Sequence, residues 1–356
     1  MIRLSLTSSE VDMRLLSIAC IALALTGVAA PLTSAAPGVT YQTAVEANPT
    51  EDLVSPCRYE LTLLDPSKRI LGVWVIFDRG RDMLRYYGDP DVSAFARRHD
   101  LALLYPFHCG AKTVPSGDIS GDPASGLGRA LFTALSQFAD RTVHPELASA
   151  KLILLGFSGT GALVARFPGF APERVLAAID SNPGHFDPFG VDTIQLSREA
   201  ATVPQLIIVG GDDAVSGTGR PYEYFRRHFD NGAPWTFVVQ NNVPHCCVIN
   251  AKALVLQWLE AVAFTKAESG TYGFIQTSAS EHTDCESPVP PASPIWCHSG
   301  TDTWGGTNWS VTMARTSTRR DTPSRMLPAG WLPNVRFAAA WLKFVLDNEH
   351  PVTSLP

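Results

Sequence analysis

Charged residues are scarce in this chain of 356 residues, where they make up only 17% of the sequence and leave a formal net charge of −6. No long run of lysine and arginine interrupts this acidic balance. Nucleic-acid binding needs many basic side chains against the phosphates, so the composition argues against nucleic acid as the main partner. Hydrophobic residues reach 45%, which is typical of a globular protein with an ample core.

The sequence also lacks the Cys and His spacing of a zinc site, and we expect neither a metal nor an organic cofactor. Its largely apolar N-terminal run, from Leu15 to Leu25, is shorter than the about 18 residues that a membrane span needs. Arg14 precedes this run and small residues follow it through Ala36, as in a secretion signal. We therefore expect residues 1–36 to be a cleaved signal peptide, with Met13 as an alternative start. The mature protein is then secreted or periplasmic, without stable membrane insertion.

Six cysteines follow the signal segment, and in an exported chain they favour disulfide bonds. Cys285 and Cys297 share one Pro- and Ser-rich stretch, and we expect them to pair with each other. One member of the adjacent pair Cys246-Cys247 should then pair with Cys57 or with Cys109.

Short apolar runs alternate with amphipathic segments between residues 57 and 265. The expected strands cover residues 57–64, 70–77, 101–107, 151–155, 175–179, 204–209 and 235–240. The expected helices cover residues 92–99, 127–138, 162–166, 222–229 and 251–264. Buried strands of this length that alternate with helices predict a parallel sheet covered on both faces. A turn at residues 65–68 predicts that the first two strands form a hairpin.

The strand-to-helix turn at Ser158 is the clearest functional signal. An apolar run at residues 152–155 leads into Gly156-Phe157-Ser158-Gly159-Thr160-Gly161, and a helical segment follows at once. Small residues around the serine permit a sharp turn that exposes its hydroxyl, beside the free N–H groups of the next helix. This arrangement favours Ser158 as the nucleophile of acyl-transfer chemistry, although a glycine-rich turn can also serve close packing alone.

A serine nucleophile needs a base within hydrogen-bond reach, and ligands of parallel sheets bind outside the carboxyl ends of the strands. His245 directly follows the last expected strand of this region and precedes its last helix, so we expect it to be the base. His185, after the strand at residues 175–179, is the second choice. His108 also follows a strand, but one that lies before the serine in the chain.

The group that orients the base should come from the loop before it. Gly210-Gly211-Asp212-Asp213 directly follows the strand at residues 204–209. We expect Asp213 to be the acid, because a turn from Gly210 would direct it back across the sheet. Asp212 stays open as the alternative and Asp180 as a more distant one, and both residues of the Asp212-Asp213 pair could instead cap the next helix.

The order Ser158, Asp213, His245, with each residue in a loop after a successive strand, resembles the α/β-hydrolase superfamily over roughly residues 57–264. The likeness is greatest to secreted bacterial esterases and polyester-depolymerase-like hydrolases. The usual Gly-x-Ser-x-Gly pattern is changed at its last position, where Thr160 stands. The resemblance implies the α/β-hydrolase fold, a mostly parallel central sheet with helices on both faces, here with a C-terminal extension.

The resemblance also implies an oxyanion hole. Its donors would be the backbone N–H of Gly159 and one N–H from the loop after Phe77. We assign the second donor to Arg79, with its neighbours Asp78 and Gly80 as alternatives. The implied activity is hydrolysis of carboxylic esters, either small or polymeric, through an acyl-enzyme intermediate. We expect the enzyme to be a monomer. A serine peptidase or acyltransferase on the same fold is the alternative, and a non-catalytic binding protein is a further one.

The expected domains follow from these assignments. Residues 37–56 form an extended lead-in, residues 57–265 the catalytic domain, and residues 266–356 an extension that packs on it and ends in a helix at 331–346. Four aromatic residues are expected either in an acyl pocket or in the core: Tyr86, Tyr87, Phe186 and Phe189.

Overall fold

A computed structural model describes residues 38–54, 56–112, 122–184, 196–264, 295–301, 307–312, 330–333, 335–347 and 350. All of these residues belong to one compact unit, Ala36–Pro356. None of the helices in these ranges combines the length and the apolar character that crossing a membrane requires.

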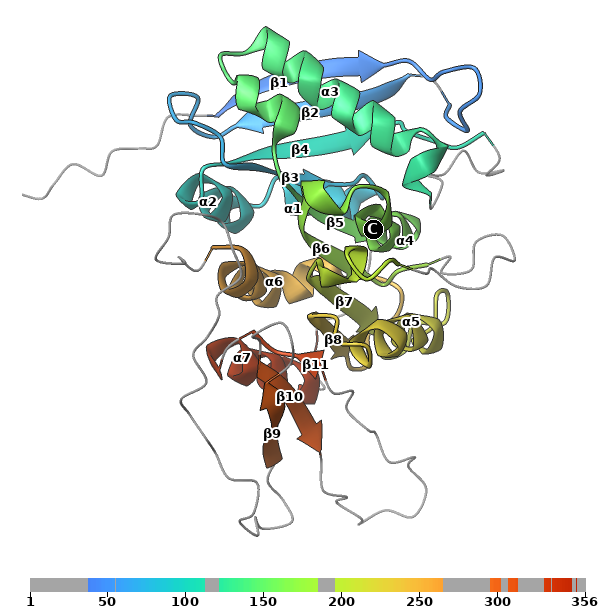
Figure 1. Ribbon diagram of the computed structural model, residues 1–356, viewed down its shortest axis with the longest axis vertical. Coiled ribbons are helices and arrows are strands. Elements are labelled where there is room, and N and C mark those ends of the chain that lie inside the picture. Colours follow the sequence, from blue (N-terminus) through green and yellow to red (C-terminus); the bar gives the residue numbers. More distant parts are fainter. Residues whose placement is uncertain are drawn as a thin grey trace, which may run out of the picture. The chain divides into compact units, whose positions relative to one another are not determined.

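A mostly parallel sheet of eight strands forms the centre of the unit (Figure 1). Its strands lie in the order β1-β2-β4-β3-β5-β6-β7-β8. Their bounds are β1 Val39–Val45, β2 Cys57–Leu63, β3 Gly72–Ile76, β4 Leu101–Phe107, β5 Leu152–Phe157, β6 Val175–Ser181, β7 Gln205–Gly210 and β8 Trp235–Gln240. The β2 strand runs antiparallel to both of its neighbours, and every other neighbouring pair is parallel. The carboxyl ends of six strands, β3 to β8, therefore meet at one edge of the sheet.

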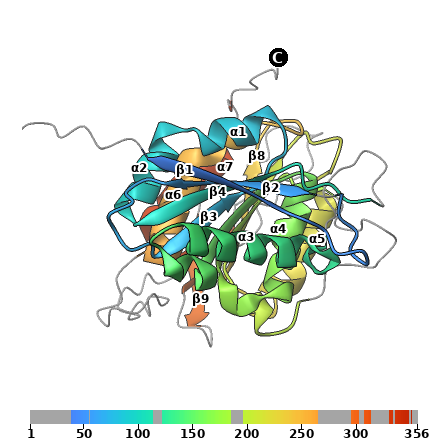
Figure 2. The ribbon, with the colours of Figure 1, turned by 90° about the horizontal axis from the view of Figure 1, so that it is seen from above.

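Two layers of helices cover the sheet (Figure 2). One layer contains α3 Leu127–Arg141, α4 Gly159–Phe170 and α5 Gly219–Phe229. The other contains α1 Arg81–Tyr87, α2 Pro90–Arg98, α6 Lys252–Leu259 and α7 Val335–Leu346. Because both faces are covered, all residues of β3, β5 and β7 are buried, and all of them are apolar or glycine except Gln205 at the start of β7. Alternate side chains serve the two layers, so that Val73 packs with α3 and Trp74 packs with α1 and α2.

This is the α/β-hydrolase architecture, and the predicted fold class is confirmed. The predicted hairpin is wrong: β2 pairs with β1 and β4, whereas β3 pairs with β4 and β5. The turn at residues 65–68 does form, since Lys68 N–H donates to the Asp65 carbonyl. A turn reverses the chain direction but does not determine which strands pair. Here β1, which lies in the expected lead-in, pairs with one edge of β2.

The predicted link from Cys246 or Cys247 to the N-terminal half is also wrong. The two adjacent cysteines form a disulfide with each other, while Cys57 and Cys109 are buried free thiols, and the Cys109 thiol donates to the Phe107 carbonyl. Strand order gives the reason, because β2 lies near one edge of the sheet and the Cys246-Cys247 segment follows β8 at the other. Cys285 lies outside the described residues, so its expected pairing does too.

Tyr86 and Tyr87 belong to the core: Tyr86 packs edge-on against Trp74, and the Tyr87 hydroxyl bonds to Thr62. Phe186 and Phe189 lie outside the described residues.

The C-terminal helix begins later than expected, at residue 335, because Gly330–Trp331 forms β11 of a separate three-stranded sheet. The other two strands of that sheet are β9 Ile295–Thr301 and β10 Thr307–Thr312.

Candidate active site

Ser158 occupies the turn between β5 and α4 with a backbone conformation of φ 55° and ψ −122°. Non-glycine residues rarely adopt such angles, and they persist only where the surroundings hold them. Gly156 is needed beside it, because an added Cβ would lie 2.2 Å from the Thr160 carbonyl oxygen. The Thr160 hydroxyl accepts the Phe157 N–H and lies within hydrogen-bond distance of the Phe157 carbonyl, each at 2.8 Å. Threonine at this position therefore closes the turn.

The end of β6 and the residues after it hold the backbone of the serine from both sides. Ser158 N–H donates to the Ser181 carbonyl at 3.0 Å, and Gly184 N–H donates to the Ser158 carbonyl at 2.9 Å. These two bonds fix the strained residue while its side chain remains directed toward the loops at the carboxyl edge. Ser158 is buried, with only 6% of its surface exposed.

The structure brings Ser158, His245 and Asp213 together in one hydrogen-bonded chain. The His245 Nε2 atom lies 2.9 Å from Ser158 Oγ, and the His245 Nδ1 atom lies 2.8 Å from Asp213 Oδ2. The three residues follow β5, β8 and β7, which are separated in sequence but end at the same edge of the sheet. The Phe157 ring lies 4.9 Å from the imidazole and limits its rotation.

Asp213 is held by four donors. Its Oδ1 atom accepts the N–H groups of Val215 and Ser216 at 2.9 and 2.8 Å, and its Oδ2 atom accepts the Asn182 amide at 3.2 Å in addition to His245. Burial by itself raises the pKa of this carboxyl, but the hydrogen bonds from His245, the Ser216 N–H and Asn182 outweigh it and hold the pKa below its usual value. The group is therefore an anion at neutral pH.

The alternatives that the sequence left open lie elsewhere. Asp212 is exposed, and its N–H donates to the Val243 carbonyl. Asp180 is wholly buried within β6, where its carboxyl oxygens have no hydrogen-bond partner and burial raises its pKa well above normal. His108 packs its ring against Phe107. His185 lies outside the described residues.

The loop after β3 contains the three residues considered as the second oxyanion donor. Asp78 N–H donates to the Pro106 carbonyl at 3.2 Å, and Gly80 N–H donates to the Asp78 carboxylate at 3.1 Å. The Tyr105 hydroxyl also donates to that carboxylate, at 2.7 Å. The N–H groups of both alternatives to Arg79 are thus already hydrogen-bonded within the protein, and Arg79 lies between them in the chain. Gly159 is the first residue of α4, where backbone N–H groups point toward the turn.

Sequence reasoning missed two polar residues and one covalent feature of this site. Asn182 follows a buried strand at the same edge of the sheet as Asp213. The search for polar residues directly after buried strands, which identified Asp213, could therefore have identified Asn182 as well. Ser216 lies three residues after Asp213, and its hydroxyl lies 3.3 Å from His245 Nδ1. The disulfide between Cys246 and Cys247 directly follows His245 in the chain.

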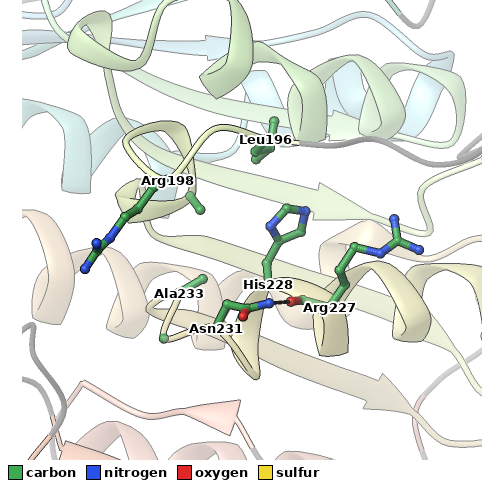
Figure 3. Close-up of a pocket in the computed structure, with 8 residues that line it drawn as sticks. Leu196, Arg198, Arg227, His228, Asn231 and Ala233 are labelled. Atoms are coloured by element: carbon green, nitrogen blue, oxygen red, sulfur yellow. Dashed lines mark hydrogen bonds between the residues drawn. The ribbon is translucent and has the colours of Figure 1, made fainter.

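A cavity of about 530 Å³ is lined by residues from the segments that precede β7 and β8 in the chain (Figure 3). Its lining residues are Leu196, Arg198, Ala201, Arg227, His228, Asn231, Gly232 and Ala233. The guanidinium groups of Arg198 and Arg227 point to opposite sides of it, so they do not converge on one ligand (Figure 3). The His228 ring packs against Trp235 at 4.6 Å.

The sequence matches no protein-family model and no curated protein. Among solved structures, a thermostable esterase is similar at 13% identity and a TM-score of 0.40, over 57% of this chain and 54% of that one. A ferulic acid esterase is similar at 12% identity and a TM-score of 0.46, over 64% of this chain and 98% of that one. The fluorophosphonate-binding serine hydrolase F of Staphylococcus aureus is similar at 14% identity and a TM-score of 0.44, over 63% of this chain and 98% of that one.

Proposed function

We propose that this protein is a serine hydrolase that cleaves carboxylic esters through an acyl-enzyme intermediate. One observation supports this most: the chain of hydrogen bonds from Ser158 Oγ through the His245 imidazole to the Asp213 carboxylate, at 2.9 and 2.8 Å. A nucleophile, a base and an orienting acid at such distances are the parts that covalent acyl transfer needs.

In the acylation half, His245 Nε2 accepts the proton of Ser158 as Oγ attacks the ester carbonyl carbon. The negative charge that develops on the carbonyl oxygen is stabilised by the N–H groups of Gly159 and Arg79. The tetrahedral intermediate then expels the alcohol, which takes the proton from His245. Water repeats the sequence on the acyl-enzyme, releases the carboxylic acid and restores the serine. Asp213 remains an anion throughout and stabilises the imidazolium.

We also propose that the enzyme is exported as a monomer, with residues 1–36 as its signal peptide. Residues 57–265 are then the catalytic domain, preceded by the lead-in at 37–56 and followed by the extension at 266–356. The buried disulfide of Cys246 and Cys247 supports an oxidising compartment, because cytosolic thiols are kept reduced.

Labelling with a fluorophosphonate, followed by turnover of p-nitrophenyl esters of graded chain length, tests the reaction. We expect the mature protein to be labelled covalently and to hydrolyse these esters. Ser158→Ala should lose both properties and His245→Gln should lose turnover. Ser136→Ala is the matched control, because Ser136 is exposed on α3 and its hydroxyl donates to a carbonyl of its own helix.

Three results would contradict the proposal. Absence of both labelling and ester turnover in the wild type would leave a binding protein. Cleavage of amides in preference to esters would indicate a peptidase, and transfer to an alcohol in preference to water would indicate an acyltransferase.

A further inference from the structure

Asn182 is a fully buried polar residue at the carboxyl end of β6, beside the proposed active site. Its backbone has a positive φ of 42°, and its N–H donates to the Ile208 carbonyl on the neighbouring strand β7. Its side-chain Nδ2 atom donates to Asp213 Oδ2 at 3.2 Å. This is the oxygen that also accepts the His245 Nδ1–H. The amide therefore shares one carboxylate oxygen with the proposed base.

Local packing fixes the orientation of this amide. The Ser181 hydroxyl donates to Asn182 Oδ1 at 3.2 Å, which leaves the NH₂ end to face Asp213. On the other side, a Cβ added to Gly210 would lie 3.0 Å from Asn182 Nδ2 and 2.4 Å from the Val243 carbonyl oxygen. Glycine at position 210 thus makes room for the amide between the end of β7 and the segment before His245.

Ser216 connects the same residue to the imidazole. Its hydroxyl lies 3.4 Å from the Asn182 carbonyl oxygen, to which it donates, and 3.3 Å from His245 Nδ1. The segment 181–184 also holds the Ser158 backbone, as described above. One short segment therefore contacts the nucleophile and the acid directly, and the base through Ser216.

We propose that Asn182 is a positioning residue that controls the basicity of His245 through Asp213. This rests on the proposed role of His245 as the base. A neutral donor on Oδ2 spreads the negative charge of the carboxylate and weakens its hold on the imidazolium proton. Without that donor, Asp213 would stabilise the imidazolium more strongly and the pKa of His245 would rise. A base with a raised pKa is protonated over more of the working pH range.

Other titratable groups on the packed elements are few among the described residues. Asp212 is exposed on the loop after β7, and Asp180 on β6 is kept uncharged by burial. Helix α1 contacts η5 (Val248–Ala251), the short helix that follows the His245 segment. The charged residues there are Asp82 at the start of α1 and Arg79 in the loop before it. None of the four has a hydrogen bond to His245 among those described, whereas Asp213 has one of 2.8 Å.

Two variants test the proposal without disturbing the positive φ. Asn182→Gly removes the donor and tolerates the backbone conformation, and Asn182→Asp keeps the shape but replaces the donor by an acidic acceptor. The first measurement is the titration of the histidine ring Cε1–H signals by NMR, with the His245 signal identified by its absence in His245→Gln. The second is the pH profile of kcat/KM.

We expect the His245 midpoint to rise by about 0.5–1 pH unit in Asn182→Gly and further in Asn182→Asp. The acid limb of kcat/KM should move by the same amount, so that activity below the limb falls about three- to tenfold while activity on the alkaline plateau changes less. Asn231→Asp, at the exposed C-terminal end of α5, is the matched control and should leave the midpoint unchanged. Ser216→Ala should move it the opposite way, because a lone pair that faces Nδ1–H is lost.

An unchanged or lowered midpoint in both Asn182 variants would overturn the proposal, and an equal loss of activity at all pH values would assign Asn182 a purely structural role. The NMR titration separates the two hypotheses. A raised midpoint in a protein that hydrolyses no ester would uphold this inference and defeat the proposed function. Should Asn182→Gly fail to fold, the isosteric Asn182→Asp variant decides.

Discussion

The proposed role of Arg79 can be tested apart from its side chain, because an oxyanion donor acts through its backbone N–H. Arg79→Pro removes that N–H, and we expect kcat to fall about 10²–10³-fold, the usual loss for one such donor. Arg79→Ala keeps the N–H and should retain most of the activity. Steady-state kinetics on a p-nitrophenyl ester measure both. A comparable loss in the two variants would instead assign the role to the guanidinium.

Asp180 predicts a pH dependence of stability. Burial raises the pKa of this carboxyl well above its ordinary value, so it stays protonated in the folded protein and ionises in the unfolded chain. Below the pKa of Asp180 in the unfolded chain, this carboxyl costs the protein no stability. As the pH rises from there toward the folded-state pKa, the free energy of unfolding falls by up to about 1.4 kcal/mol per pH unit.

Asp180→Asn should therefore stabilise the protein at pH 8 relative to the wild type, and the difference should shrink toward pH 4. Urea unfolding at the two pH values measures this. The exposed Asp140→Asn is the matched control. If the stability difference between Asp180→Asn and the wild type were the same at pH 4 and pH 8, Asp180 would be solvated or paired.

The candidate site residues Ser158, Asp213 and His245 could be located from the sequence, because each of them follows a buried apolar strand. Asn182 follows one too, but a neutral amide has no chemistry that singles it out. The role that we propose for it rests on one contact, with Oδ2 of Asp213, that depends on how β6 and β7 pair.

At the scale of elements, the connection between β8 and α6 carries His245 and is shaped by the two cysteines after it. Cys246 N–H donates to the Pro244 carbonyl, and Cys247 adopts a left-handed conformation with φ 70° at the start of η5. The disulfide restrains the residues that immediately follow the imidazole. It closes almost no loop, so its contribution to global stability through chain entropy should be small.

Replacing both residues, Cys246→Ser with Cys247→Ser, should therefore reduce kcat/KM about tenfold by loosening His245, with a change in unfolding free energy of less than about 1 kcal/mol. Treatment of the wild type with a dithiol should have the same effect. The control is Cys57→Ser, whose side chain lies in β2 at the far side of the sheet. Undiminished turnover in the double variant would show that the loop is held by its backbone bonds alone.

Strand pairing was the weakest part of the sequence prediction. Apolar runs located each strand from β2 to β8 within a few residues, because burial on both faces leaves a strong local signal. The pairing of β2 with β4 depends instead on contacts between residues about 45 positions apart, such as Leu61 with Leu104. The exposed and buried residues of β1 alternate weakly, and this strand was expected only as extended chain.

At the scale of the whole unit, the C-terminal helix is joined to the sheet by specific bonds. Trp341 is wholly buried, and its indole N–H donates to the Phe237 carbonyl of β8 at 2.8 Å. The Asn241 amide, just after β8, donates to the Val345 carbonyl at 2.6 Å. The sequence indicated a helix at residues 331–346, but not which face of the sheet it covers.

Trp341→Ala should consequently destabilise the whole hydrolase unit, by about 3–5 kcal/mol as for other buried aromatic residues. Trp341→Phe keeps most of the packing and loses the indole N–H, so its cost should be nearer to that of one hydrogen bond, about 1 kcal/mol. Arg336→Ala, on the exposed face of α7, is the control. The test is to follow both global unfolding and the loss of ester turnover as the urea concentration rises. If α7 and the sheet unfold together, Trp341→Ala shifts the unfolding transition and the loss of turnover to lower urea by the same amount. A variant whose turnover survives to the wild-type urea concentration would show that α7 is an independent appendage, and that β8 and α6 are stable without it.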